Sequence, residues 1–474
     1  MNSVWQQLTL SNLSLQQWRG ASYLYRSFVG LLGSWRAGSQ LLRWSEALAA
    51  MLVSLVFALA PFVSNDLIGV LLFAGACFWV ILTVSDDVGH LARNAPTITP
   101  IHLLVLLYWG IATAATALSP VKTAAMTGWI KLTLYLLMFA LASRVLRKPR
   151  MRSMIITLYL HVALIVSVYG LQQWFFGAAA LATWVDPQSN MSKTTRVYSF
   201  LGNPNLLAGY LLPAVVFSLV AVFAWRRWMP KLLALTMFFV NTACLIVTFS
   251  RGGWIGLVVA IFALLVLLVY QLSAHLPRFW RTWSIPLLVG SLALVLAVAL
   301  LFVEPVRDRA LSIFAGRGDS SNNFRINVWA AVIEMIKDRP FLGIGPGNSA
   351  FNKIYPLYQR PRYNALSAYS FLLEVAVETG FIGLACFAWL LIVTLNTGLQ
   401  YLIRHREGSR DALWLMGAIA SLLGILAHNT FDTVLYRPEV NTLWWLIVAI
   451  IASYYSTSVT RKDSSQSYSL RECL

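Results

Sequence analysis

The sequence predicts an all-α bundle of transmembrane helices, and its composition carries that prediction. Of the 474 residues, 58% are hydrophobic and only 11% are charged. Soluble domains have about 25% charged residues, so this composition is typical of a polytopic membrane protein. Long apolar runs indicate that the spanning segments are helices, which satisfy their own backbone hydrogen bonds within lipid.

The apolar runs define the number of spans. A helix rises about 1.5 Å per residue, so about 20 apolar residues cross roughly 30 Å of hydrocarbon. About twelve runs approach this length. They lie near residues 47–64, 67–84, 101–119, 124–142, 154–176, 205–225, 232–249, 253–273, 285–303, 371–397, 411–430 and 441–457.

The net charge of +18 follows from topology. With the N-terminus inside, the inner segments contain 21 Lys and Arg residues and the short outer loops contain five. Positive charge is retained on the cytoplasmic side of membrane proteins. We therefore expect both termini to be cytoplasmic, and we expect no nucleic-acid partner, because the basic residues lie between apolar runs.

These spans divide the chain into five parts. Residues 1–46 form a cytoplasmic amphipathic arm, 47–303 contain spans one to nine, 304–370 form an outer (periplasmic or lumenal) loop, 371–457 contain the last three spans, and 458–474 form a cytoplasmic tail. The arm has arginines among aromatic and aliphatic residues and no acidic residue before Glu46. It suits a helix held on anionic membrane lipids; a partner-binding arm is the alternative.

The outer loop contains one predicted helix and one predicted turn. SSNNFRINVWAAVIEMIKDRP reads as an amphipathic helix with an Asn or Ser cap and a stop at Pro340, lying against the membrane surface. Its apolar residues recur at helical spacing: Phe324, Val328, Trp329, Val332 and Ile336. LGIGPGN follows a helix and not a strand, so it predicts a sharp turn and not a dinucleotide loop.

Several ionisable residues lie within the predicted spans, where a charged side chain has an unfavourable free energy. Lys131 lies about 10 Å below the outer end of its span and is expected to face the bundle interior; snorkelling toward the membrane interface is the alternative. Glu374 and Glu378 are neighbours on one helix face. They suit either a proton or cation relay, or a helix start where carboxylates pair with nearby arginines, namely Arg360, Arg362 or Arg325.

His428 and Asp432 have the same spacing and the same two interpretations, ion coupling or a structural pair. None of the four cysteines shows zinc or redox spacing, so the sequence predicts no metal and no cofactor.

Four segments together resemble one superfamily of membrane proteins. They are FLGNPNLLAGYLLP (200–213), which includes Asn203, Pro204 and Asn205, TFSRGGWIGL (248–257), FRINVWAAVIEMIKDRPFLGIGPGN (324–348) and VETGFIG (377–383). All are similar to the O-antigen ligase and polymerase superfamily, and the likeness extends from about Gly170 onward. Within it, the chain most resembles the cyanobacterial branch described as inorganic carbon (bicarbonate) transporters, which favours the plasma membrane over the thylakoid.

The resemblance implies particular site residues. Ligases of this superfamily join a glycan linked to a lipid diphosphate to an acceptor at the outer face, with arginines on the diphosphate. Arg251 and Arg325 stand in matching contexts, and Arg196 in the preceding outer loop is a further anion-binding candidate, as is Lys131.

The histidine that the family carries is absent. It precedes the Glu of an ExG motif by about nine residues, and nine residues before Glu378 this chain has Tyr369, followed by Ser370. Tyrosine has a pKa near 10 and is a poor general base at neutral pH. His428 is the one histidine expected on the outer side, so it is the candidate substitute; a hydrogen-bonded structural histidine is the alternative.

The sequence therefore leaves three functions open. The favoured one is a membrane protein without enzymatic activity that takes up a small anion, bicarbonate, for inorganic carbon accumulation. The second is a glycosyltransferase that moves a glycan from a polyprenyl diphosphate carrier. The third is a non-catalytic relative that acts as a regulator.

Overall fold

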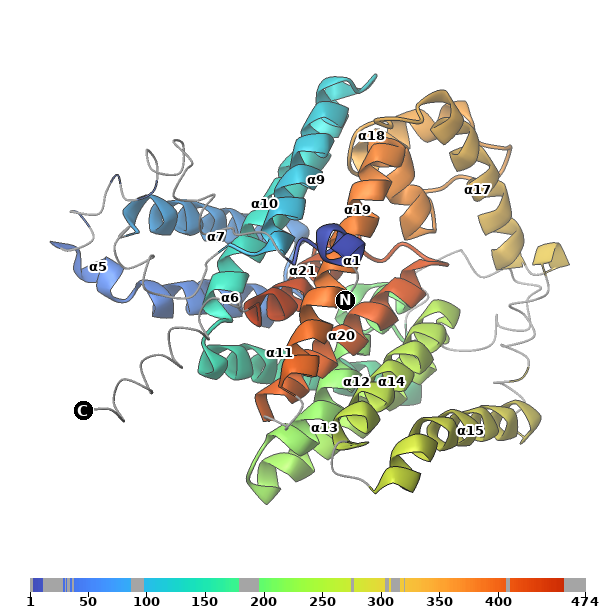
Figure 1. Ribbon diagram of the computed structural model, residues 1–474. Helices are drawn as coiled ribbons and strands as arrows, with labels where there is room; N and C mark the ends of the chain where they lie inside the picture. The colour runs from blue at the N-terminus through green and yellow to red at the C-terminus, as the bar shows by residue number, and fades with distance from the viewer. Residues whose placement is uncertain are drawn as a thin grey trace.

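The protein is helical throughout the part of the chain that its computed structural model describes (Figure 1). That part comprises residues 3–11, 29, 31, 35, 38–86, 98–178, 196–273, 277–302, 307, 316–318, 320–405 and 410–455. Helices are present and strands are absent within these residues, which confirms the predicted all-α class.

The described helices match the predicted spans one for one. Nine are long and apolar enough to cross a membrane: α7 (Asn65–Ser85), α9 (Pro100–Ala117), α10 (Lys122–Val145), α11 (Pro149–Phe176), α12 (Pro204–Ala224), α13 (Trp228–Val247), α14 (Arg251–Leu272), α19 (Phe371–Arg404) and α20 (Arg410–Asn429). Two shorter apolar helices, α6 (Ser45–Leu59) and α21 (Pro438–Ser453), and α15 (Arg278–Phe302) cover the other three runs. The chain is therefore a polytopic integral membrane protein.

Helix α12 lies in the centre of the bundle and packs against α13, α14 and α20. Small residues let α14 and α20 approach closely. A Cβ added to Gly424 would lie 2.7 Å from the Ala260 Cβ and 2.8 Å from the Gly256 carbonyl oxygen. Such contacts are typical of membrane helices, whose association depends on close backbone packing.

Ion pairs join the helix ends that the topology assigns to the inner side. Arg152 of α11 is buried, reaches Asp411 at the start of α20 and donates to the Ser453 hydroxyl at the end of α21 (3.0 Å). Its guanidinium also lies 3.8 Å from the centre of the Tyr454 ring. These contacts agree with the predicted alternation of the spans; the orientation of the termini remains a prediction.

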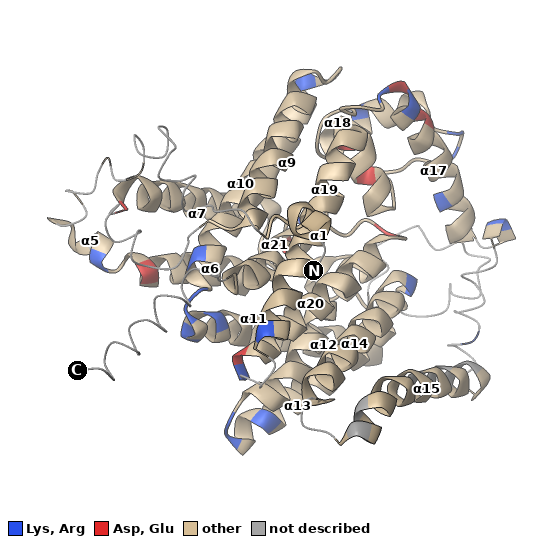
Figure 2. Ribbon diagram, viewed as in Figure 1, with Lys and Arg blue, Asp and Glu red and all other residues tan. Residues whose placement is uncertain are grey.

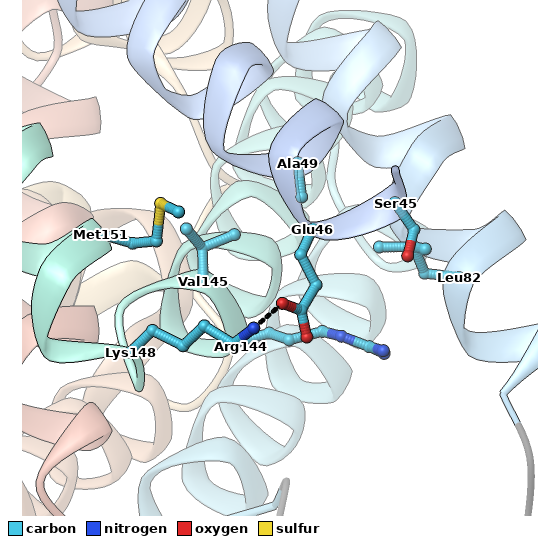
Figure 3. Close-up of a pocket in the computed structure, with 8 residues that line it drawn as sticks. All are labelled: Ser45, Glu46, Ala49, Leu82, Arg144, Val145, Lys148 and Met151. Carbon is cyan, nitrogen blue, oxygen red and sulfur yellow. Dashed lines mark hydrogen bonds and ion pairs between the residues drawn. The ribbon is translucent and has the colours of Figure 1, made fainter. Parts of the chain in front are cut away.

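A small hollow near the same end shows how the first spans are tied to α10 and α11 (Figure 3). It is lined by Ser45, Glu46, Ala49, Leu82, Arg144, Val145, Lys148 and Met151, and Lys148 reaches Glu46 across it. Arg144 forms a bidentate pair with Asp86, with N–O distances of 2.5 and 2.8 Å. The basic residues of this hollow are thus neutralised by carboxylates of the chain itself.

The predicted outer loop contains the expected amphipathic helix, α17 (Ser320–Asp338), followed by the short α18 (Asn348–Ile354). Val328, Val332 and Ile336 are buried on α17, as its periodicity predicts. They form a second apolar core with Ala124 and Ala125 of α10 and with residues of α19. Helix α17 therefore packs on the protein, beside α10 and α19.

The predicted turn at LGIGPGN is inserted into a break in α19. Gly380 has φ 68° and ψ −175°, which interrupts the helix. The amides of Ile344 and Gly345 donate to the carbonyls of Val377 and Glu378, both at 2.9 Å. The loop thus supplies donors at the break, as membrane helices require where their backbone is irregular. The sequence analysis did not identify this break.

At the N-terminus, α1 (Ser3–Leu8) packs against α19 beyond the break. The Trp5 indole donates to Asn396 (3.2 Å), and the Trp389 indole donates to the Leu8 carbonyl (2.6 Å). Helix α5 (Gln40–Arg43) precedes α6. Most of the predicted amphipathic arm lies outside the described residues, and so does the predicted tail at 458–474.

Candidate functional site

The three arginines predicted to bind an anion lie near one another at the end of the bundle that the topology predicts to be the outer one. Arg196 lies between α11 and α12, Arg251 is the first residue of α14, and Arg325 lies on α17. The surroundings of Arg196 include the charges of both other arginines and of Asp432. Figure 2 shows basic segments at the start of α14 and on α17 on the same side of the molecule. We call Arg196, Arg251, Arg325 and Asp432 the arginine cluster.

Arg196 is held by the segments on either side of it. Its Nε donates to the Thr248 carbonyl (2.9 Å), and its Nη2 donates to the side-chain oxygen of Asn205 (3.1 Å). Asn203 caps α12 by accepting from the Asn205 amide (2.8 Å), and Pro204 occupies the first turn. The family-motif residues therefore begin α12 and orient Arg196, a role that their spacing alone did not indicate.

The surroundings of Arg196 disfavour the charged form of its guanidinium. Burial, with smaller contributions from the Arg325 and Arg251 guanidiniums, lowers its pKa to about 10 against the opposing effect of the Asp432 carboxylate. Arg196 still carries its charge at neutral pH. Burial and the neighbouring positive charges both disfavour the cation. An anion bound among the arginines would therefore stabilise the charged form of Arg196.

Arg325 and Asp432 form an ion pair between α17 and the segment linking α20 to α21. Arg325 Nη2 lies 3.7 Å from Asp432 Oδ2, and Arg325 Nη1 donates to the Ser321 hydroxyl (3.0 Å). The expected pairing of Arg325 with Glu374 or Glu378 is therefore wrong. Arg360 donates to Asn327 (2.8 Å), and Arg251 Nη1 donates to Asn322 (2.8 Å).

Tyr369, which the resemblance places at the position of the family histidine, lies just before α19. It has a φ of 50°, its ring meets Phe324 edge to face at 5.4 Å, and its carbonyl accepts from the Trp329 indole (3.4 Å). Burial raises the pKa of Tyr369, and the nearby Asp432 carboxylate raises it further. The phenol therefore stays protonated at neutral pH and cannot act as a general base there.

His428 is completely buried at the end of α20, in a cradle of three glycines. A Cβ added to Gly252 would lie 2.6 Å from its Cδ2, and Cβ atoms added to Gly209 and Gly256 would lie 3.5 Å and 3.1 Å from other His428 atoms. Neither ring nitrogen has a hydrogen-bond partner among the described residues. The hydrogen-bonded structural histidine is thus not observed, and the ring is closed off from solvent.

The two glutamates of α19 have different environments. Glu378 Oε1 accepts from the Gly347 amide (2.8 Å) and so anchors the turn inserted at the helix break. Glu374 is buried, and its Oε2 has no hydrogen-bond partner among the described residues. The structure therefore gives Glu378 a structural contact, whereas ion coupling by Glu374 remains a prediction.

Lys131 does not join the site. Its side chain is exposed on α10, so the expectation that it faces the bundle interior is wrong. Depth along a span does not specify which face of the helix a residue occupies. The long alkyl chain lets such a lysine reach toward the membrane interface.

Gln173 of α11 holds the backbone next to Arg196, and the sequence analysis did not single it out. Its Oε1 accepts from the amides of Tyr198 (3.1 Å) and Ser199 (2.8 Å), and Ser199 has a φ of 50°. Gln173→Leu is expected to lower stability by about 1–3 kcal/mol, because it leaves buried donors unpaired. Unfolding in detergent measures this loss. Gln172→Leu, at an exposed position, is the control, and equal stability of the two variants would contradict the assignment.

One known protein family matches part of the chain. Residues 232–388 match the model of the O-antigen ligase family. This segment of the chain is similar to O-antigen ligases. The match includes Arg251, Arg325, Tyr369 and the broken part of α19, and it supports the superfamily resemblance without supporting the bicarbonate branch. No curated protein matches the chain.

Proposed function

We propose that this O-antigen ligase-like protein binds a polyprenyl diphosphate-linked glycan at the arginine cluster and transfers the glycan to an acceptor. The observation that carries the proposal is the convergence of Arg196, Arg251 and Arg325 around Asp432. Among the described residues of the cluster, three guanidiniums lie near one carboxylate, so positive charge is in excess. A diphosphate diester carries about two negative charges and bicarbonate about one, so the diphosphate complements the cluster better.

Positive charge at the position of the arginines would promote glycan transfer. When the bond between the sugar C1 and the diphosphate breaks, negative charge develops on the leaving oxygen. Prepositioned guanidiniums stabilise such charge in the transition state. Arg251 begins the 22-residue helix α14, whose N-terminal end carries a partial positive charge that adds to this effect.

The alternatives are bicarbonate uptake and a non-catalytic regulator. Both use the same outer surface, and neither requires a site that binds two phosphates. Turnover separates them from transfer, because only transfer releases free polyprenyl diphosphate.

The test uses purified protein in proteoliposomes supplied with a sugar-labelled polyprenyl diphosphate donor and a membrane extract as acceptor, and separately with labelled bicarbonate under an ion gradient. The expected result is release of polyprenyl diphosphate, reduced roughly 100-fold in Arg325→Ala. Arg317→Ala removes one exposed charge from the outer loop and is the matched control. Gradient-dependent bicarbonate accumulation without diphosphate release would contradict the proposal.

A further inference from the structure

Glycan transfer requires a group that accepts the proton of the attacking hydroxyl, and Tyr369 cannot supply it. Asp432, just beyond the end of α20, lies in the arginine cluster and contributes to the electrostatic surroundings of Tyr369 and Arg196. We propose that Asp432 is the catalytic base of the transfer reaction. This inference rests on the proposed function and adds the residue that the family motif lacks.

The contacts of Asp432 leave one oxygen suited to this role. Oδ1 accepts from the Thr433 amide (2.8 Å), which fixes the carboxylate plane. Oδ2 faces Arg325 Nη2 at 3.7 Å, longer than the 2.7–3.2 Å typical of a hydrogen bond. The Arg325 charge therefore lies close to Oδ2, while the oxygen retains the capacity to accept a proton.

The other candidate bases differ from Asp432 in their contacts. His428 is fully enclosed by the glycine cradle. Glu378 accepts from the Gly347 amide within the helix break. Glu374 is as buried as Asp432 (7% and 6% exposed), but among the described residues it forms no ion pair with an arginine of the cluster. Among the described residues, Asp432 is the one carboxylate that forms an ion pair with an arginine of the cluster.

The proposed transfer conserves atoms, electrons and protons. The acceptor oxygen forms a bond to the sugar C1 as the bond from C1 to the diphosphate oxygen breaks. The electron pair leaves with the diphosphate, which the three arginines hold, and the acceptor proton moves to Asp432 Oδ2. The proton then passes to water. A carboxylate performs the same task for an attacking water in inverting glycosidases.

Asp432→Asn distinguishes a base from a residue that only orients Arg325. With the same donor in proteoliposomes, the rate of polyprenyl diphosphate release at saturation is expected to fall about 100- to 10,000-fold. The affinity for polyprenyl diphosphate should stay constant or increase, because a negative charge beside the arginines is removed. Asp66→Asn, at an exposed position in the first turn of α7, is the control and should leave both quantities unchanged.

Chemical rescue gives a second measurement that does not depend on the asparagine variant. Asp432→Ala removes the carboxylate, and added formate should restore part of the rate by supplying another one. Formate should not restore Arg325→Ala, which lacks a cation. Asp432→Glu keeps the charge and should retain more activity than Asp432→Ala.

Two results would overturn the inference. One is turnover by Asp432→Asn at the wild-type rate, which leaves the proposed transfer intact and removes only the base assignment. The other is a loss of diphosphate affinity that accounts for the whole loss of rate, which would make Asp432 a positioning residue. If the wild-type protein releases no polyprenyl diphosphate, the proposed function and the inference fail together.

Discussion

Gly380→Ala is expected to destabilise the protein by about 2–5 kcal/mol. The backbone at Gly380 has φ 68° and ψ −175°, a conformation that is essentially restricted to glycine. A Cβ there would also lie 2.1 Å from the Phe341 carbonyl oxygen and 2.5 Å from the Leu342 nitrogen. Both contacts are with backbone, so the turn that fills the break in α19 would have to move.

Thermal or denaturant-induced unfolding of the purified variant in detergent measures this loss of stability. Gly69→Ala in α7 is the matched control, because a Cβ at Gly69 meets nothing within 4 Å. In a helix that change should be neutral or stabilising by up to about 1 kcal/mol. Wild-type stability of Gly380→Ala would show that the break in α19 does not exist as described.

Loss of Arg251 or Arg325 is expected to weaken polyprenyl diphosphate binding by roughly 10- to 100-fold each. A hydrogen bond to a charged group contributes about 1.5–3 kcal/mol, and 1.4 kcal/mol corresponds to a factor of ten in affinity. Arg325→Lys keeps the charge but loses the planar fork, so its loss of affinity should be smaller than that of Arg325→Ala. Equilibrium binding in detergent at fixed salt measures these values.

Arg317→Ala serves again as the control, since it removes an exposed charge outside the cluster. Affinity should also fall as the pH rises through about 10, where Arg196 loses its charge. A diphosphate affinity that is insensitive to Arg251→Ala and Arg325→Ala would place the ligand elsewhere.

The spans could be predicted from sequence because the length and polarity of an apolar run are local properties. The same holds for α17, whose apolar periodicity and terminal Pro340 mark its buried face and its end. The break at Gly380 could not be predicted in this way. It depends on amides of Ile344 and Gly345, which come from a different part of the chain and reach α19 only in the folded protein.

The residues of the site were partly predictable, but their partners were not. The three arginines and Asp432 were candidates from sequence, whereas the Arg325–Asp432 pair joins segments far apart in the chain. The expected partners of Arg325 were closer in sequence, Glu374 and Glu378, and were wrong. Lys131 was misplaced for a related reason, because hydropathy locates a residue along a helix and not around it.

A cryo-EM map of the protein with bound polyprenyl diphosphate would show whether the arginine cluster is the diphosphate site. We expect density for the two phosphates among Arg196, Arg251 and Arg325, beside Asp432, with the polyprenyl chain leaving toward the membrane. Density for the phosphates at another part of the surface, with the arginine cluster unchanged, would contradict it.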